Sequence, residues 1–382
     1  MARQRRLRSI GVCAVIWLAL CAGAEARWLP THDVKVRVEH TELGGPRVAV
    51  EYELTDPNIS PESPAYVFLR YSRDFGDNWQ LVPMDALQGN GFDIVERPGR
   101  KEVFWWGTDQ TVATDPEQIE VRVRAIAMAR IPAGRFVMKA LPGGGRDESR
   151  KTGPDTNLPL YFMAKCETTV AMYADYLNEV GGDGAGWNPR MARADRCGIV
   201  QESNHTYSVA PGREDYPVTY VSWYDAMGFL RWCGLRLPTE AEWEKAVRGG
   251  LYLDGDQTRA QPNPKPERRY PWGDEAPDEG GVYRCNFDGE DDGFERLAPV
   301  GRFGKFASPY GICDLAGNVA EWTLDWYSTS YHVGLDGFRT VRGGSWMAVP
   351  EGCDAVTGAT QLPLQESSIM GFRGVRATAT AP

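Results

Sequence analysis

Between Val34 and Met128, apolar and polar residues alternate in short runs. The clearest runs span residues 34–38, 47–54 and 119–124. A period of two predicts β-strands with one buried face, and turn-forming residues such as Gly44-Gly45-Pro46 separate the runs. About seven strands fit into this length, which predicts an all-β sandwich of the immunoglobulin or fibronectin III type over residues 28–128.

After Ala129 the apolar positions recur with a helical period. One set contains Val170, Tyr173, Leu177 and Val180, and another contains Ala226, Phe229, Leu230 and Cys233. Each set falls on a single helical face. Ser222 with Asp225, and Thr239 with Glu242, are typical helix starts, and Gly249 ends the last helix. The rest is rich in glycine and turns, so we expect an α+β domain with much irregular structure over residues 129–378.

The first residues predict a secretory signal. Four arginines precede an apolar run from Ile10 to Ala22, and small residues follow up to Ala26. We therefore expect residues 1–26 to be removed and the mature protein to be secreted or periplasmic. The run is shorter than the roughly 20 residues of a spanning helix, so no transmembrane segment is expected. A lipoprotein signal at Cys21 is the alternative, which the bulky Leu20 disfavours.

Charge and cysteine content narrow the classes of partner and metal. The net charge of −10 disfavours nucleic acid and anionic lipid. Outside the signal, the cysteines are Cys166, Cys197, Cys233, Cys285, Cys313 and Cys353. Their spacing predicts no particular disulfide pairing. There is no CxxC pair and the four histidines are dispersed, so a zinc or three-histidine iron site is not expected.

Six segments of the second domain carry a resemblance. They are residues 216–223 (YPVTYVSW), 235–244 (LRLPTEAEWE), 270–274 (YPWGD), 310–322 (YGICDLAGNVAEW), 342–346 (RGGSW) and 371–373 (GFR). In this order they resemble the formylglycine-generating enzyme family over about residues 130–377. The resemblance implies a C-type-lectin-like variant fold. Segments 66–79 and 101–107 also resemble the small β-domain found ahead of such domains, with a spacer or docking role.

The resemblance implies two structural calcium ions. One ligand set is Asn286, Phe287, Asp292 and Phe294, and the other is Asp314, Gly317, Val319 and Glu321. Carboxylate, amide and main-chain oxygens are hard ligands that suit Ca2+, and the phenylalanines would contribute main-chain oxygens. From the residues alone, a solvated acidic loop is the alternative at each position.

The family's oxidase activity uses copper(I) held by two cysteines, and here only one of them is present. The matching positions are Ala348 and Cys353. Because copper(I) prefers soft thiolates and alanine offers no donor, Cu+ in its standard form is not expected. Ser345 and Cys353 are the candidate catalytic residues, and Asp354 stands where the family has a basic residue. Cys353 is a disulfide partner, a free buried thiol or a reactive residue with a different ligand.

Two functions follow from this reading. The first is a secreted binding or scaffold protein, a pseudoenzyme that contacts a protein, peptide or glycan. Its groove would contain Trp322, Trp326, Tyr327, Tyr331 and Trp346, for which packing in the core is the competing explanation. The second is an active oxygen-dependent oxidase that converts a sulfatase-type cysteine to formylglycine, or a related periplasmic oxidative maturation. It would need a relocated copper site involving Cys353 and another cysteine.

Overall fold

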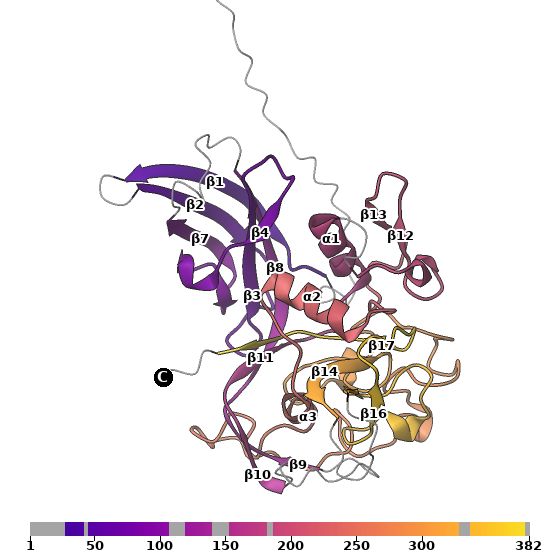
Figure 1. Ribbon diagram of the computed structural model, residues 1–382. Coiled ribbons are helices and arrows are strands. Elements are labelled where there is room, and N and C mark those ends of the chain that lie inside the picture. Colours follow the sequence, from indigo (N-terminus) through magenta and orange to yellow (C-terminus); the bar gives the residue numbers. More distant parts are fainter. Residues whose placement is uncertain are drawn as a thin grey trace, which may run out of the picture.

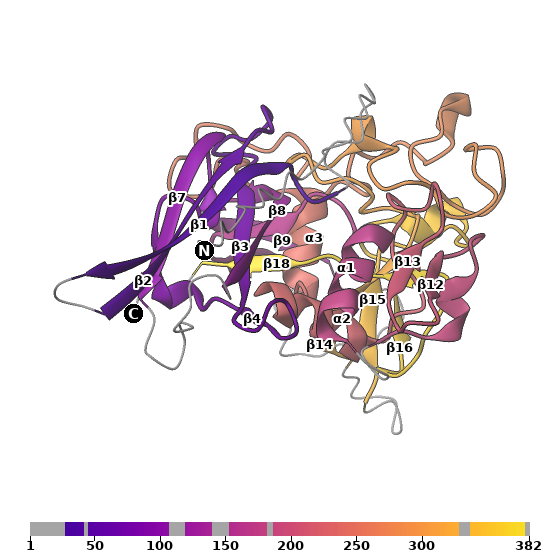
Figure 2. The same cartoon turned by 90° about the horizontal axis from the view of Figure 1, so that it is seen from above.

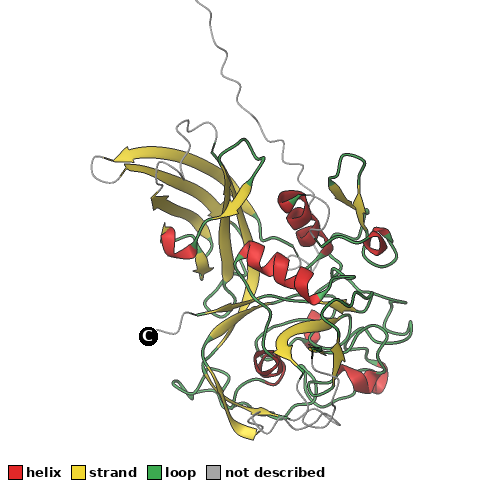
Figure 3. Ribbon diagram, in the orientation of Figure 1, coloured by secondary structure: helices red, strands yellow, loops and turns green. Residues whose placement is uncertain are grey.

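The computed structural model describes residues 27–41, 45–106, 119–139, 153–181, 186–327 and 337–378. The predicted signal, residues 1–26, lies outside these residues. Within them, three α-helices stand among many strands and long loops (Figure 1, Figure 3). This confirms the expected α+β class. Among the same residues, no helix is both long and apolar enough to cross a membrane.

Two antiparallel sheets form the N-terminal part. One has the order β1 (Thr31–Thr41), β2 (Gly45–Leu54), β7 (Gly99–Trp106), β5 (Leu87–Gly89). The other has the order β18 (Val375–Ala377), β11 (Tyr161–Ala164), β8 (Glu120–Ile131), β3 (Ala65–Ser72), β4 (Trp79–Leu81), with β6 (Asp93–Val95) beside β3. Alternate residues such as Val48 and Val50 of β2 and Val67 of β3 share one buried core, as a period of two requires. The immunoglobulin or fibronectin III assignment stays a prediction.

Strand β8 connects the N-terminal sheets to the rest of the molecule. Its first residues pair with β3, from Glu120 opposite Ser72 to Ala127 opposite Ala65. Its last residues pair with β11, from Met128 to Ile131. The predicted boundary at residues 128 and 129 therefore falls inside a continuous strand. Figure 2 shows β8 and β18 between the N-terminal strands and the loop-rich part.

The described residues contain three α-helices, and the second and third begin where the capping residues predict. They are α1 (Val170–Val180), α2 (Trp223–Cys233) and α3 (Glu240–Arg248). Ser222 and Asp225 form a capping box at α2, and Thr239 and Glu242 form another at α3. Such boxes satisfy amide groups that have no partner within the helix. Gly249, with φ of 80°, ends α3. The apolar faces of α1 and α2 are buried in one large core.

The loop-rich part contains short strands and single helical turns. One sheet has the order β16 (Gly358–Gln361), β15 (Arg339–Arg342), β14 (Ala320–Trp326), β17 (Met370–Gly371), and two hairpins are β9 (Gly134–Met138) with β10 (Gly153–Leu158) and β12 (Ile199–Gln201) with β13 (Tyr207–Val209). The 3-10 turns are η1 (Met84–Ala86), η3 (Pro189–Ala192), η4 (Glu279–Gly281), η5 (Gly304–Phe306) and η6 (Pro350–Cys353). Long loops between these elements carry most of the predicted site residues.

A buried ion-pair cluster fixes α1 against the N-terminal sheet. The Glu179 side chain, on α1, is fully buried and contacts Arg70 of β3 at 2.6 Å and Arg122 and Arg124 of β8 at 2.8 and 2.7 Å. The indole N–H of Trp232 on α2 donates to the same carboxylate at 2.9 Å. Burial alone would raise the pKa of Glu179, but Arg124, Arg122 and Arg70 hold it below its ordinary value. At this junction between α1 and the N-terminal sheet, the protein itself supplies the positive charge that balances Glu179.

Candidate functional site

The loop after β15 brings the chain back against Cys353. Gly343 and Gly344 have positive φ values of 94° and 71°. A Cβ atom on Gly344 would lie 2.7 Å from the carbonyl oxygen of Gly352 and 3.1 Å from the sulfur of Cys353. Real Cβ atoms do not approach backbone so closely, so the motif needs glycine here for both conformation and contact.

The structure places the candidate catalytic residues in this loop without a standard copper site. Ser345 is buried, and its hydroxyl oxygen accepts the Met347 N–H at 3.3 Å, a contact that shapes the turn. Ala348 is half-buried and presents only a methyl group. Cys353 is fully buried, and its thiol is 3.8 Å from the carbonyl oxygen of Val349. The pair at 348 and 353 therefore does not fit a two-thiolate copper(I) ion.

A second thiol, from Cys285, lies beside Cys353. Both cysteines are buried in one small cluster with Phe287 and Ala316, and Ala348 packs against that cluster. Burial, together with the neighbouring Cys353 thiol, raises the pKa of Cys285 well above its ordinary value. The sequence does not indicate this contact, because no local pattern relates two residues so distant along the chain.

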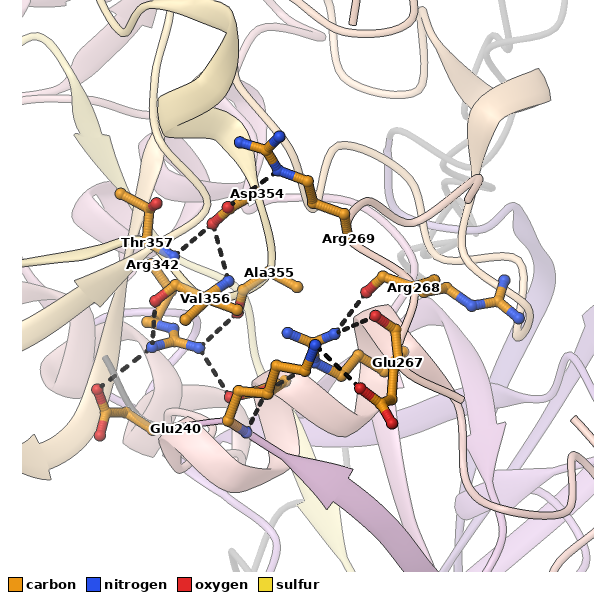
Figure 4. Close-up of polar contacts among 12 residues, drawn as sticks. Glu240, Glu267, Arg268, Arg269, Arg342, Asp354, Ala355, Val356 and Thr357 are labelled. Atoms are coloured by element: carbon orange, nitrogen blue, oxygen red, sulfur yellow. Dashed lines mark hydrogen bonds and ion pairs between the residues drawn. The ribbon is translucent and has the colours of Figure 1, made fainter. Parts of the chain in front are cut away.

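The segment after Cys353 is held by charged groups (Figure 4). The Asp354 carboxylate accepts the N–H groups of Val356 and Thr357 at 2.9 and 2.5 Å and contacts Arg269 at 3.3 Å. The buried Arg342 donates to the carbonyl oxygen of Ala355 at 2.6 Å. Asp354, at the position where the family has a basic residue, thus stabilises the segment that follows Cys353.

The first predicted calcium set is brought together in one loop. The Asp292 carboxylate accepts the N–H of Phe287 at 3.1 Å and that of Phe294 at 2.9 Å. Burial raises the pKa of Asp292. Asn286 is fully buried, and its NH2 group donates to the Arg296 carbonyl at 2.7 Å. Its Oδ1 atom accepts no hydrogen bond from any residue that the structure describes. A cation ligated by this oxygen would remove the cost of leaving it buried and unpaired.

The two predicted calcium loops lie directly against each other. Asn286 and Gly317 form a parallel β-bridge, and the Asn318 N–H donates to the Asn286 carbonyl at 2.8 Å. Gly317 has φ of 73°, and a Cβ atom on it would lie 2.0 Å from that carbonyl oxygen. Glycine at this position is therefore a condition for the contact between the loops.

In the second predicted set, Asp314 and Glu321 have different surroundings. Glu321 is buried and bidentate with Arg373, at 2.6 and 2.7 Å, and also accepts the indole N–H of Trp243 at 3.1 Å. Asp314 accepts the Gly301 N–H at 2.5 Å, and burial raises its pKa to about 6. The backbone N–H of Gly317, also in this set, donates to Gly343. Glu321 is thus paired with an arginine, whereas Asp314 forms no ion pair with any residue that the structure describes.

Glu167 lies near this second set, and no motif in the sequence indicated it. It is buried, accepts the Asn318 side-chain N–H at 2.8 Å and faces the N–H of Val319 at 3.4 Å. Burial, followed by the negative charges of Asp314 and Glu321, raises the pKa of Glu167 well above its ordinary value. A cation near these carboxylates would relieve the excess of negative charge.

Main-chain oxygens are part of both predicted calcium ligand sets. Within the described residues, no group of three or more His, Cys, Asp or Glu side chains is arranged to hold a metal ion. The predicted sets differ from such groups, because their remaining ligands are main-chain carbonyl oxygens at Phe287, Phe294, Gly317 and Val319. Oxygens of this kind are common Ca2+ ligands.

The predicted aromatic groove divides into core and surface residues. Trp322 is fully buried, and its indole N–H donates to the Val221 carbonyl at 3.1 Å, so it packs in the core. Trp326 is 52% exposed and stacks on the Arg339 guanidinium, whose carbon lies 3.4 Å from the ring centre. Trp346 and Tyr327 are half-buried, and Tyr331 lies outside the described residues.

The loop-rich α+β fold and the order of the sequence motifs together are typical of one class of proteins. Comparison with known sequences identifies that class. The model of the sulfatase-modifying factor enzyme 1-like domain family matches residues 112–378. The chain belongs to this family.

The relatives include enzymes and an inactive homologue. The chain is 36% identical to a formylglycine-generating enzyme of Streptomyces coelicolor over 183 residues, which cover 42% of this chain and 53% of the relative. It is also 36% identical to the inactive C-alpha-formylglycine-generating enzyme 2 of Mus musculus over 280 residues, covering 65% of this chain and 84% of the relative. The structure of PvdO from Pseudomonas aeruginosa matches with a TM-score of 0.45 and 22% identity, over 66% of this chain and 94% of that one. The chain thus spans about half the length of the Streptomyces relative.

Proposed function

We propose that this protein is an extracytoplasmic binding or scaffold protein built on a formylglycine-generating-enzyme-like domain that has lost the standard copper site. The observation that carries the proposal is Ala348, which presents a methyl group where the family has a copper ligand. Copper(I) held by two sulfurs needs both thiolates, and one buried thiol cannot replace the pair. The predicted signal at residues 1–26 supports export.

The binding surface would include the exposed Trp326. Its ring lies over Arg339, whose guanidinium also lies 3.8 Å from the ring centre of Trp223. The neighbouring Tyr224 is 52% exposed. Exposed aromatic rings held rigidly by a cation suit the flat faces of a peptide or a sugar.

Calcium would stabilise the loops from which this scaffold is built. The donor atoms fit: Asn286 Oδ1 has no hydrogen-bond partner among the described residues, and the pKa values of Asp292 and Asp314 are raised by burial. A bound Ca2+ would supply positive charge to Asn286 and Asp292 in one loop and to Asp314 and Glu321 in the other. Its role would be structural.

An active oxidase is the second candidate, and one contact favours it. The Cys285 thiol lies beside Cys353, so two sulfur atoms lie together in this protein, although not at the family's positions. An oxidase that uses this pair would lose turnover in Cys353→Ala and in Cys285→Ala. It would keep turnover in Cys233→Ala, a matched control with another buried cysteine.

The deciding experiment is copper(I) titration of the reduced protein, followed by incubation with a cysteine-containing sulfatase-motif peptide in air. Mass spectrometry of the peptide detects conversion of its thiol to an aldehyde. We expect neither tight stoichiometric copper binding nor aldehyde. Aldehyde formation that depends on Cys353 would overturn the scaffold proposal in favour of the oxidase.

A further inference from the structure

Four of the six cysteines in the described residues stand in two pairs. All six carry free thiols in the structure and all are buried. Cys285 and Cys353 belong to one small cluster, and Cys166 and Cys313 belong to another. In each pair the neighbouring thiol contributes to a raised pKa, that of Cys285 in the first pair and that of Cys166 in the second, as expected for two thiols buried in one cluster. Contact between two sulfurs is the first geometric condition for a disulfide.

The backbone also holds the first pair together. The Asp288 N–H, shortly after Cys285, donates to the carbonyl oxygen of Ala348 at 2.9 Å. The second anchor is Gly317, which forms a β-bridge with Asn286 and donates its N–H to the carbonyl oxygen of Gly343 at 2.8 Å. The segments that carry the two thiols are therefore fixed side by side, independently of the sulfur atoms.

The second pair is anchored in the same way. The Cys313 N–H donates to the carbonyl oxygen of Lys165, the residue before Cys166, at 2.9 Å. Val300 packs against both cysteines. A covalent bond between these two thiols would thus join segments that are already adjacent.

The other two cysteines have different neighbours. Both lie in the large helical core. The main-chain oxygen of Cys233 accepts the Tyr66 hydroxyl at 2.7 Å, and its thiol faces the Leu230 carbonyl at 3.3 Å. Burial raises the pKa of the Cys197 thiol, and its neighbours Thr219, Ile199 and Arg213 oppose that shift. These surroundings are typical of buried structural thiols.

We propose that Cys285–Cys353 and Cys166–Cys313 are the disulfide-forming pairs of this protein, and that Cys197 and Cys233 remain thiols. The oxidant is a low-molecular-weight disulfide such as oxidised glutathione. One protein thiolate attacks a glutathione sulfur and releases one glutathione thiolate. The second protein thiolate then attacks the mixed disulfide and releases the other. Two protein S–H bonds and one glutathione S–S bond become one protein S–S bond and two glutathione S–H bonds.

The two bonds would fasten the loops that carry the calcium ligand candidates. Cys285 directly precedes Asn286, Cys313 directly precedes Asp314, and Cys166 directly precedes Glu167. Each bond closes a long loop of the chain, which lowers the entropy of the unfolded state. This inference concerns the cysteines themselves and does not depend on the proposed binding role.

The test is refolding of the reduced protein in a glutathione redox buffer, followed by alkylation in denaturant and non-reducing peptide mapping. We expect two linked peptides, one joining Cys285 to Cys353 and one joining Cys166 to Cys313, with Cys197 and Cys233 alkylated. Reduction should lower the melting temperature by about 5–10 °C.

Single variants sharpen the assignment. Cys285→Ala should make Cys353 alone newly available to alkylation, and Cys166→Ala should do the same for Cys313. The matched control is Cys233→Ala, which removes another buried cysteine and should leave both linked peptides in place. Because the readout is the peptide map, loss of stability in a variant does not obscure it.

Three results would overturn the proposal. The first is any other pairing, such as Cys197 with Cys233. The second is alkylation of all six thiols after oxidative refolding. The third is protection of Cys285 and Cys353 only when copper(I) is added, without a linked peptide, which would make the pair a metal site. The scaffold proposal has a separate test, because aldehyde formation by the reduced protein would contradict it without affecting the disulfide assignment.

Discussion

Two buried acidic clusters of this protein have opposite charge balance. At the junction, one carboxylate, Glu179, meets three guanidinium groups, and its pKa is held below the ordinary value. In the loop-rich part, Glu167, Asp314 and Glu321 lie near Arg373. There the pKa values of Glu167 and Asp314 are raised by burial.

This difference in charge balance distinguishes a cluster that is neutralised within the protein from one that keeps an excess of negative charge. Glu179 receives its compensating charge from the protein, so nothing further is needed for its burial. The loop carboxylates outnumber the arginine beside them, and they can become neutral only by binding protons or a cation. The same residue type thus stabilises one region and leaves an excess of negative charge in the other.

The largest expected effect comes from breaking the junction. Glu179→Ala leaves Arg70, Arg122 and Arg124 without their common partner, and we expect a loss of about 3–5 kcal/mol in the free energy of unfolding. Urea denaturation measures it. The control is Asp195→Ala at an exposed ion pair, where we expect a loss below about 1 kcal/mol. Equal losses in both variants would remove the distinction between the junction and an ordinary surface pair.

A steric change tests the contact between the two calcium loops. Gly317→Ala places a Cβ atom 2.0 Å from the Asn286 carbonyl oxygen, and we expect a loss of about 2–4 kcal/mol in the free energy of unfolding from this overpacking and the strained backbone. Gly311→Ala is the matched control, because its φ of 74° equals that of Gly317 within a degree but no atom lies within 4 Å of the new Cβ. It should cost only the strain of the left-handed conformation, about 1 kcal/mol. Thermal unfolding of both variants separates contact from strain.

Removing calcium should weaken the loop-rich part. At a concentration 100 times its Kd, an ion that binds only the folded state adds about 2.7 kcal/mol to the free energy of unfolding. A chelator should therefore lower the melting temperature, as calorimetry would show. Asp292→Asn should reduce that shift, whereas Asp291→Asn, on the exposed neighbouring residue, should not. A melting temperature indifferent to both chelator and calcium would contradict the calcium proposal.

The smallest effect is a pH dependence with a defined sign. The pKa of Asp314 is about 6 in the folded protein, against about 3.9 for an ordinary aspartate. The folded state holds the proton longer, so this contribution to stability is present below about pH 4 and is lost as the pH rises through about 6. We expect calcium-free wild type to lose about 2 kcal/mol more in the free energy of unfolding than Asp314→Asn over this window. Denaturation curves of the two proteins at several pH values provide the comparison, and identical slopes would count against it.

The lowered pKa of Glu179 predicts the opposite sign at the junction. Its stabilisation is present above the ordinary glutamate pKa and is lost as the pH falls through the lower folded-state value. The two clusters should therefore respond to pH in different directions, which the same series of denaturation curves can test.

The sequence by itself determined the local elements and the family. Alternating residues marked β2 and β8, the helical period marked α1, and the pairs Ser222 with Asp225 and Thr239 with Glu242 marked the starts of α2 and α3. These signals are local, because period and capping depend on residues a few positions apart. The six motifs indicated the family for a similar reason, because each is a short run of neighbouring residues that can be recognised without the fold.

Only the tertiary structure decided which distant residues meet. It placed Cys285 beside Cys353 and Glu167 beside Asp314, and it continued β8 across the predicted domain boundary. In these loops the path of the chain follows from glycine conformations, buried contacts and backbone bonds between remote segments, such as that of Gly317 with Asn286. No periodicity encodes such contacts, so the charge balance and the thiol pairs became visible only once the chain was folded.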